Sequence, residues 1–486
     1  MPPAQELTAP SSPRLPALAV PRVAVRYRVA LGVLALTALT FLVPSAPTYD
    51  PWAWILWGRE VLHLDLSTLD GPSWKPLPVL LTTPFALFGS LAPDLWLFAA
   101  RAGAIAGVVM AFRVARRLGG VPAGAAAAAA YAIAPWTIRN AAMGNSEGLL
   151  VALALAAVDR HLAGRFRHAF LFGLAAALLR PEVWPFLGLY GLWLFWREAR
   201  SRTLVALGFA ALPPLWLLPE LWGSGDLLRA AHRAHNPRAN SAAFAEDPIG
   251  EVVRQFGTML TPALWIGLGA LAAMTLLRLA PGRREQRAVI ALALAAAVIV
   301  GEVAVMTNDG FSGNTRYMIL PAALVCVLAG TGIGWAVRAL PRRLAGSGLV
   351  VAAVAAVAAV GFALPSVNRL DLVRASIEYQ ARLTDGLPGT VARAGGADRL
   401  LACGTPYTGA FQVPVVAWQL GVHITTVRSA SAPGDAPPRP PGVAFRSRTT
   451  SSSRLAVPGI DTLGGEAGTQ TFAFGGGWRI VGRCHA

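Results

Sequence analysis

The sequence has 486 residues, of which 55% are hydrophobic and only 14% are charged. That charged fraction is well below the roughly 25% of soluble domains, which disfavours a large soluble all-α protein. A net charge of +17 would suggest nucleic acid as the partner of a soluble chain, but here the arginines lie in short gaps between apolar runs, as in cytoplasmic loops of membrane proteins. We therefore expect the lipid bilayer, and no nucleic acid, as a partner.

The chain begins with residues 1–24, rich in Pro, Ala and Ser and predicted to form a disordered cytoplasmic tail. Three arginines, Arg22, Arg26 and Arg28, precede the first apolar run, 29–44. No clear small-residue cleavage site follows this run, so we expect a retained first helix rather than a signal peptide.

The stretch 45–93 is different, because charges and tryptophans interrupt it. Within it, 52–64 separates apolar from charged residues on a helix and is predicted to lie in the membrane interface, and the proline-containing run 76–92 could do the same. Ten further apolar runs follow, at 95–112, 121–138, 148–158, 169–179, 183–196, 203–219, 257–277, 288–306, 317–337 and 347–364.

The gaps between these runs alternate in charge, and every second gap holds three or four arginines. This alternation predicts about eleven transmembrane helices with a cytoplasmic N-terminus and an extracytoplasmic C-terminal region. The fold class is thus a polytopic α-helical membrane protein, with the transmembrane module at 25–365 and a long polar loop at 220–255.

The C-terminal stretch 366–486 is less apolar and is predicted to be a small extracytoplasmic α/β domain, with strand-like pieces at Val413–Trp418 and Val422–Val427. Two of the three cysteines, Cys403 and Cys484, lie in this stretch. If the stretch is extracytoplasmic they could form a disulfide; the alternative is two unrelated free thiols.

Ionisable side chains are costly inside a bilayer and usually face a cavity or a partner. On the predicted outer side they gather at one face of the membrane, whereas a transporter would more often place them near the midplane. The candidates are Asp50, Lys75, Arg101, Arg139, Glu147, Arg180, Glu182, Asp309 and Arg316, with Tyr49 beside Asp50.

Two of these candidates lie in the first outer loop. Asp50 follows the first helix and could act as a general base on an acceptor; alternatively it caps a helix that begins at Pro51. Lys75 is the only lysine in the chain and could supply a compact cation to a phosphate; alternatively it is an interfacial lysine beside Trp74.

Further along, Arg316-Tyr317 begins a helix, where Arg316 could hold a phosphate or could serve with Tyr317 as an interface anchor. Arg180 and Glu182 could form an ion pair, and Arg101 needs a partner or a phosphate. The sequence has no phosphate-binding glycine loop and no nucleotide fingerprint, so a soluble nucleotide-binding mechanism has no support. It has no zinc CxxC pair either, and no metal site is predicted.

The order of these motifs resembles the GT-C integral-membrane glycosyltransferases, nearest to the branch with protein O-mannosyltransferases and the lipid A aminoarabinose transferase. The resemblance covers about residues 25–340. It rests on Tyr49-Asp50, Trp74-Lys75-Pro76-Leu77, Leu87-Phe88-Gly89, Arg101, Ala115-Arg116-Arg117-Leu118-Gly119, Ala134-Pro135 to Arg139, and Arg316-Tyr317 with Pro321.

The resemblance implies a polyprenyl-phosphate sugar donor and an extracytoplasmic acceptor, which would be a cell-wall glycan, a lipid or a protein. It places the catalytic acid at Asp50 and donor-phosphate contacts at Lys75, Arg316 and Tyr317. Many members have a second acid directly after the first, where this chain has Pro51, so an acidic partner or a divalent cation stays open. Where members often carry Asp, this chain has Gly144-Asn145 with Glu147 nearby.

Two other functions compete with glycosyl transfer. A lipid-linked-sugar transporter or flippase would show charges through the membrane and internal repeats, and neither is evident. A non-catalytic membrane assembly protein would use its C-terminal domain to bind a partner.

Overall fold

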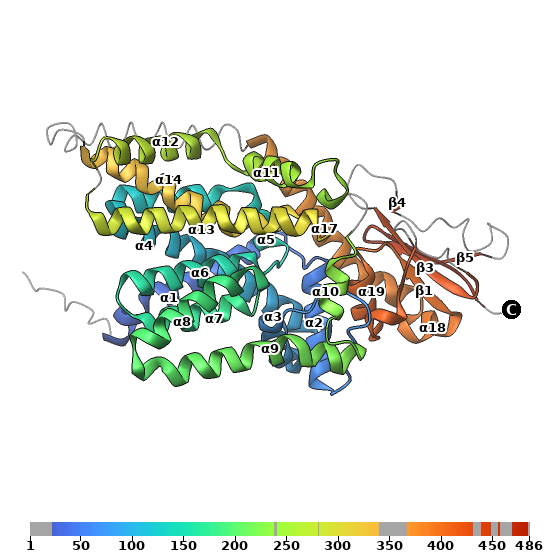
Figure 1. Ribbon diagram of the computed structural model, residues 1–486. Helices are drawn as coiled ribbons and strands as arrows, with labels where there is room; N and C mark the ends of the chain where they lie inside the picture. Colours follow the sequence, from blue (N-terminus) through green and yellow to red (C-terminus); the bar gives the residue numbers. More distant parts are fainter. Residues whose placement is uncertain are drawn as a thin grey trace, which may run out of the picture.

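The computed structural model describes residues 22–237, 241–279, 281–339, 367–430, 439–448, 455–456 and 469–484. Long helices form a bundle at one end of the molecule, and a small β-sheet lies at the other (Figure 1). Short helices, among them α2, α3, α10 and α19, lie between the two. Most of the predicted tail 1–24 and the whole predicted run 347–364 fall outside the described residues.

The described helices that precede the C-terminal part run from α1 to α14, and most of them coincide with predicted apolar runs. They are α1 (Arg22–Leu39), α2 (Tyr49–Leu62), α3 (Pro76–Phe85), α4 (Ala92–Ile133), α5 (Pro135–Ala142), α6 (Glu147–Leu162), α7 (Phe166–Ala177), α8 (Trp184–Arg197), α9 (Arg202–Ser224), α10 (Arg229–Ala234), α11 (Pro248–Met259), α12 (Pro262–Leu276), α13 (Arg283–Asn308) and α14 (Ile319–Ala339). Short 3-10 turns join several of them, including η1 (Thr40–Leu42), η3 (Pro181–Val183) and η6 (Thr315–Met318).

Within the described residues, four helical stretches are long and apolar enough to cross a membrane: Pro76–Ile133, Ala199–Ser224, Arg283–Asn308 and Thr315–Ala339. Two bent pairs, α5 with α6 at 116° and α11 with α12 at 95°, raise the number to six if each pair is one span. The polar turn between α5 and α6 carries Asn145, so this bend places an amide just before the start of α6.

The predicted long polar loop at 220–255 contains more helix than expected. Helix α9 continues to Ser224, α10 lies within the stretch, and α11 begins in it and ends at Met259. Helix α11 starts with Pro248 in its first turn, after Asp247, whose side chain accepts a hydrogen bond from the Gly250 amide at 2.9 Å. Asp before Pro is a capping pattern that can be recognised in the sequence. The helix has a polar face, however, so it does not form an apolar run.

The C-terminal part consists of α17 (Val367–Arg393), α18 (Gly396–Cys403), α19 (Val413–Leu420) and a six-stranded sheet. The strands lie in the order β2 (Arg428–Ser429), β1 (Thr405–Thr408), β3 (Gly442–Arg448), β6 (Trp478–Arg483) and β5 (Gln470–Gly475), with β4 (Leu455–Ala456) also paired to β3. Strand β1 is parallel to β2 and β3, and the remaining pairs are antiparallel. The sheet packs against α17, where Trp478 Nε1 donates to the Leu383 carbonyl at 2.7 Å.

The strand predicted at Val413–Trp418 is wrong, because these residues form helix α19. Pro414 lies in the first turn, where proline suits a helix, and Gly421 ends the helix at φ +72. Burial against α2 outweighs the strand preference of the valines. The second predicted strand, 422–427, is also wrong: it contains the 3-10 turn η7 (Ile424–Thr426), and β2 follows it.

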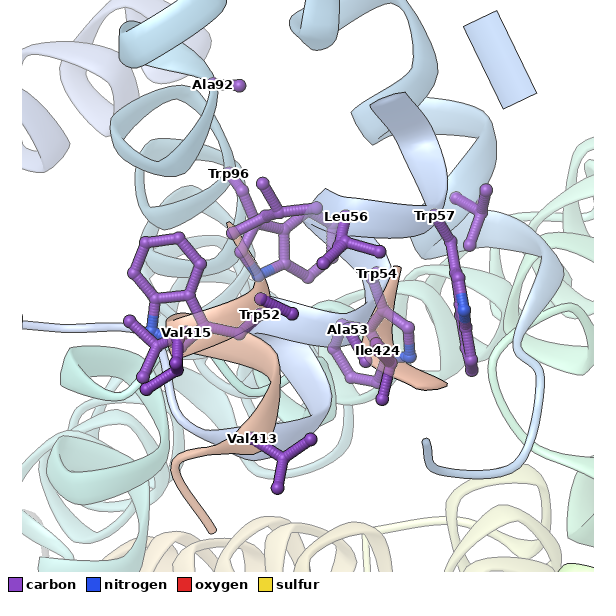
Figure 2. Close-up of a cluster of buried hydrophobic side chains, with 14 of the residues drawn as sticks. Trp52, Ala53, Trp54, Leu56, Trp57, Ala92, Trp96, Val413, Val415 and Ile424 are labelled. Atoms are coloured by element: carbon purple, nitrogen blue, oxygen red, sulfur yellow. The ribbon is translucent and has the colours of Figure 1, made fainter. Parts of the chain in front are cut away.

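Helix α2 is almost wholly buried, although it is too short to span a bilayer. Trp54 and Trp57 are 0% exposed, and Trp96 of α4 packs edge-to-face on Trp54 at 5.4 Å between ring centroids (Figure 2). From the C-terminal part, Val413 and Ile424 reach the same cluster (Figure 2). The helix predicted to lie in the membrane interface is thus enclosed between the bundle and the C-terminal part.

Polar contacts also hold the C-terminal part on α2. His423 Nδ1 lies 2.8 Å from Glu60 Oε1, and its Nε2 lies 3.1 Å from Asp65 Oδ2. Beside them, the rings of Trp52 and Trp418 lie 6.1 Å apart. The helix that begins next to Asp50 is therefore fixed by residues about 360 positions later in the chain.

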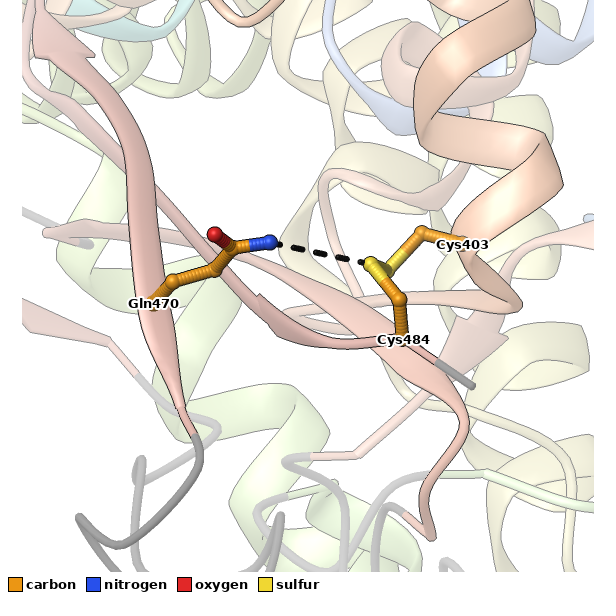
Figure 3. Close-up of a disulfide and its surroundings, with 3 residues drawn as sticks. All are labelled: Cys403, Gln470 and Cys484. Carbon is orange, nitrogen blue, oxygen red and sulfur yellow. Dashed lines mark hydrogen bonds between the residues drawn. A yellow bond between two sulfur atoms is a disulfide. The ribbon is translucent and has the colours of Figure 1, made fainter. Parts of the chain in front are cut away.

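Cys403 and Cys484 form a disulfide that joins the end of α18 to the residue after β6 (Figure 3). Gln470 of β5 lies beside it, with its amide nitrogen 3.8 Å from the Cys484 sulfur. The cross-link spans 81 positions of sequence and ties the end of the last strand to a helix that packs on β1 and β3. Cys326, buried in α14, is a free thiol.

Candidate active site

Asp50 lies in the first turn of α2, between the helical bundle and the C-terminal part (Figure 1). Backbone hydrogen bonds place the preceding segment along the end of α5: the Ala46 amide donates to the Ala142 carbonyl at 3.2 Å, and the Thr48 amide to that of Met143 at 3.1 Å. The helix starts at Tyr49 with Thr48 as its N-cap, so Asp50 does not cap a helix that begins at Pro51. Its carboxylate, 15% exposed, is free to face another element.

That element is the turn η6, which carries Arg316. One guanidinium nitrogen, Nη2, donates to Asp50 Oδ2 at 2.8 Å, and the other, Nη1, donates to Asn145 Oδ1 at 2.9 Å. The side chain of Asn314 caps the turn by accepting from the Arg316 amide at 3.0 Å. The planar fork of one arginine therefore joins α2 to the α5–α6 bend.

Asn145 is a site residue that the sequence did not single out. Besides Arg316, its Oδ1 accepts from Thr48 Oγ1 at 3.3 Å, and its Nδ2 donates to Asn140 Oδ1 at 2.9 Å. The side chain is 4% exposed. These contacts fix the amide so that its oxygen faces the arginine. The sequence feature that could have identified Asn145 is its position: members of the family that the chain resembles often carry Asp there.

A second buried ion pair lies close to the first. Arg180 Nη2 donates to Glu147 Oε1 at 2.7 Å, and Arg180 Nη1 lies 3.5 Å from Glu182 Oε1. The guanidinium carbon of Arg180 also lies 4.3 Å from the centre of the Tyr317 ring. Glu147 begins α6, Arg180 precedes η3 and Tyr317 follows Arg316 in η6, so three distant segments converge here.

Lys75 completes the cluster from the loop between α2 and α3. It is the N-cap residue of α3 and is 9% exposed, with its ammonium nitrogen 5.0 Å from the centre of the Trp54 ring. Burial, together with the charge of Arg180, lowers the pKa of Lys75 to about 7. No described side chain accepts a hydrogen bond from this ammonium, so its three N–H donors are available to a ligand.

Burial and the neighbouring positive charges shift the pKa of Asp50 in opposite directions. Burial by itself would raise the pKa of this carboxyl group, but the positive charges of Arg316 and Lys75 outweigh it and hold the pKa below its ordinary value. Asp50 is therefore ionised at neutral pH. The cluster contains three carboxylates, of Asp50, Glu147 and Glu182, and three cations, of Lys75, Arg180 and Arg316, that can meet an anionic group.

The structure brings seven of the predicted site residues together: Asp50, Lys75, Glu147, Arg180, Glu182, Arg316 and Tyr317. It does not bring in Arg101, which is buried beside the end of α1. Its Nη1 donates to the Thr40 carbonyl at 2.9 Å, and its guanidinium carbon lies 4.7 Å from the centre of the Phe41 ring. Arg101 thus has a packing contact where a phosphate contact was predicted.

Three other candidates lie around the cluster rather than in it. Tyr49 precedes Asp50 but packs on Phe411, with ring centroids 6.4 Å apart. Arg139 is an exposed residue of α5, and Asp309 is the residue at which α13 ends. In the described ranges, no three His, Cys, Asp or Glu side chains are grouped as metal ligands.

A separate open cavity of about 530 Å³ lies where η1 and the residues after it meet α17. Its lining includes Phe41, Ser45, Glu378, Arg382 and Asp385, and none of the residues of the charged cluster.

The chain is similar in fold to solved glycosyltransferase structures. ArnT from Cupriavidus metallidurans matches in its apo state with a TM-score of 0.54 and 14% identity, over 94% of this chain and 97% of that one. The same enzyme bound to undecaprenyl phosphate matches with a TM-score of 0.55 and 15% identity over the same shares. An oligosaccharyltransferase from Archaeoglobus fulgidus, tethered to an acceptor peptide, matches with a TM-score of 0.43 and 13% identity, over 77% of this chain and 58% of that one.

No protein-family model matches the sequence, and no curated protein sequence matches it. The ArnT comparisons span nearly the whole of both chains, so they show the fold: this chain shares the helical architecture of ArnT, and its apolar helices fit a multi-pass membrane protein with a small C-terminal sheet. The predicted polytopic α-helical fold with a small C-terminal sheet is confirmed, whereas the number of about eleven transmembrane helices stays a prediction.

Proposed function

We propose that this protein is a membrane glycosyltransferase that moves a sugar from a polyprenyl-phosphate donor to an extracytoplasmic glycan, lipid or protein. The observation that carries the proposal is the charged cluster, in which the carboxylate of Asp50 lies beside the cations of Arg316 and Lys75. The shared architecture with ArnT, which has been crystallised with undecaprenyl phosphate, supports a lipid phosphate as the anion that these cations meet.

In the proposed reaction, the Asp50 carboxylate takes the proton of an acceptor hydroxyl as the hydroxyl oxygen attacks the anomeric carbon. The bond between that carbon and the phosphate oxygen breaks, and the polyprenyl phosphate leaves with the bonding electrons. The new negative charge on the phosphate is stabilised by Lys75 and Arg316. Because the donor already carries an activated anomeric phosphate, this chemistry needs no nucleotide pocket.

Arg316 is suited to two tasks at once. Its guanidinium has five N–H donors, and the contacts with Asp50 and Asn145 use one on each terminal nitrogen. Three donors are left for a phosphate, so Arg316 can hold the leaving group while it fixes the orientation of the base. Arg180, which stacks on Tyr317, would add charge at the same place.

The proposed topology puts this cluster on the extracytoplasmic side. Along α4, Arg113 lies 21 residues after Ala92, which is about 32 Å of helix at 1.5 Å per residue and close to the thickness of the hydrocarbon core. At that far end, Asp159 is surrounded by Arg113, Arg117 and Arg160. Such an arginine-rich end supports a cytoplasmic side, opposite α2 and the C-terminal part.

The experiment that tests the function uses the purified full chain in lipid nanodiscs. It is given polyprenyl-phosphate sugars with a panel of cell-wall glycan, lipid and peptide acceptors, and the release of polyprenyl phosphate is measured by mass spectrometry. We expect release that depends on both donor and acceptor. In liposomes, movement of intact donor across the bilayer with no cleavage would instead identify a flippase and overturn the proposal.

Lys75 should give the donor reaction a pH limit. Its ammonium is charged below pH 7 and loses its charge above it, whereas a phosphodiester donor does not titrate in this range. Since kcat/KM reports the pKa values of the free enzyme, we expect kcat/KM for the donor to fall by about tenfold for each pH unit above about 7.

Two substitutions isolate this effect. Lys75→Arg keeps the charge to high pH, so its kcat/KM should be lower at pH 6.5, because the geometry differs, but flat to pH 9. Lys75→Met removes the charge at every pH, so its kcat/KM for the donor should be low even below pH 7. A Lys75→Arg enzyme with the same alkaline fall as the wild type would contradict the assignment.

A further inference from the structure

The loop that presents Lys75 is held by a second buried network that reaches it from α9 and α10. Glu220 of α9 is 0% exposed, and its Oε1 accepts from the Trp74 amide at 3.2 Å. One turn earlier on α9, the Leu215 carbonyl accepts from Trp74 Nε1 at 3.1 Å. The residue directly before Lys75 is therefore anchored through both its backbone and its ring.

Arg229, at the start of α10, holds the other side of the loop. It is 8% exposed and donates to the Pro72 carbonyl at 2.6 Å and to the Gly71 carbonyl at 3.1 Å. Its Nη1 also lies 3.6 Å from Glu220 Oε1. The buried pair of Glu220 and Arg229 thus binds three backbone groups of a loop some 150 residues earlier in the sequence. They are the Trp74 amide and the carbonyls of Gly71 and Pro72.

The loop itself cannot easily adjust. Gly71 has a φ of +101, and a Cβ built there would lie 2.9 Å from the Trp57 ring and 3.2 Å from Ile424. Ser73 Oγ adds a hydrogen bond to the Ala230 carbonyl at 2.8 Å. Because described side chains offer the Lys75 ammonium no acceptor, the position of that ammonium depends on this backbone.

We infer that Glu220 and Arg229 are positioning residues for the donor-phosphate cation: they hold residues 71–74 so that the Lys75 ammonium faces the anion site. The inference rests on the proposed function. Neither residue contacts the cluster around Asp50 directly, so both act through Lys75. The burial that keeps water away from Lys75 depends on the same network.

The test compares Glu220→Ala and Glu220→Gln with Glu251→Ala, a control that removes the acid of an exposed ion pair with Arg254 in α11. A charge-assisted hydrogen bond contributes enough to change affinity by about tenfold, so Glu220→Ala should raise the KM for the donor by about tenfold and change kcat less. Glu220→Gln keeps an acceptor for the Trp74 amide and should fall between Glu220→Ala and the wild type. If Glu220→Ala does not fold, Glu220→Gln alone carries the test.

A purely structural role would lower the amount of active enzyme without moving its pH profile. A loosened loop admits water to Lys75, so the alkaline fall of kcat/KM should move to higher pH in the Glu220 variants and stay in place in the control. Arg229→Lys should show the same movement. If the Glu220 variants had the same KM for the donor as Glu251→Ala, and their kcat/KM fell at the same alkaline pH, the inference would be overturned.

A binding readout separates this inference from the proposed function. Undecaprenyl phosphate is titrated into each variant and bound lipid is counted by native mass spectrometry at pH 6.5. Weaker binding by the Glu220 variants supports the inference even if the wild type transfers no sugar from any donor, which would overturn only the function. Equal binding by wild type and both variants overturns the inference even if transfer is observed.

Discussion

Replacing Asp50 by asparagine is expected to slow sugar transfer by at least about 100-fold, the lower end of what a positioned general base contributes. Asparagine keeps the shape of the side chain and an oxygen that can accept from Arg316 Nη2, which now donates to Asp50 at 2.8 Å. It cannot take a proton from an acceptor. The measurement is the single-turnover rate with saturating polyprenyl-phosphate sugar, so that a change in binding does not enter.

Two comparisons make this result specific. Asp94→Asn changes another aspartate in the first turn of a helix, on the exposed start of α4, and should leave the rate unchanged. Undecaprenyl phosphate should bind to Asp50→Asn about as it binds to the wild type, since Lys75 and Arg316 are still present. A folded Asp50→Asn protein that transfers sugar at the normal rate would remove the general-base role.

Breaking the ion pair between Glu147 and Arg180 is expected to cost stability as well as activity. Both side chains are buried, with a separation of 2.7 Å, and removing one partner of a buried pair typically costs about 3–5 kcal/mol because the other charge is left without compensation. The two single changes should differ: Arg180→Gln leaves Glu147 without its partner, whereas Glu147→Gln leaves Arg180 with Glu182 at 3.5 Å.

We therefore expect Arg180→Gln to be the more destabilising of the two, measured as the free energy of unfolding in a denaturant titration of the detergent-solubilised chain. The double variant should cost less than the two single changes added together, as for groups in direct contact. Glu251→Gln, on an exposed pair, serves as the reference and should change little. Additive costs for Glu147→Gln and Arg180→Gln would show that the pair is not coupled.

Much of the candidate site could be predicted because charged residues stand out in an apolar chain. Asp50, Lys75, Arg180 and Arg316 were chosen on the cost of burying a charge, and the structure places all four in one cluster. The same reasoning selected Arg101, whose Nη1 instead donates to the carbonyl and the hydroxyl of Thr40 in η1. The free-energy cost of burying a charge indicates that the charge has a partner. It does not identify that partner.

The residues that were missed depend on contacts between distant segments. Asn145 is neutral and becomes a site residue only because Arg316 reaches it from 171 positions away. Glu220 follows an apolar run and looked like the first residue of a loop, yet α9 continues through it and buries it against residue 74. Likewise, the valines of α19 have strand propensity, and only their burial against α2 makes them helical.

The contact between Glu60 and His423 also has a consequence for biosynthesis. The two residues are 363 positions apart, so at about 5–20 residues per second some 20–70 s separate their emergence from the ribosome. During that time the tryptophan face of α2 has no C-terminal part to cover it. Helix α2, with Asp50 in its first turn, is therefore covered by the C-terminal part only late in synthesis.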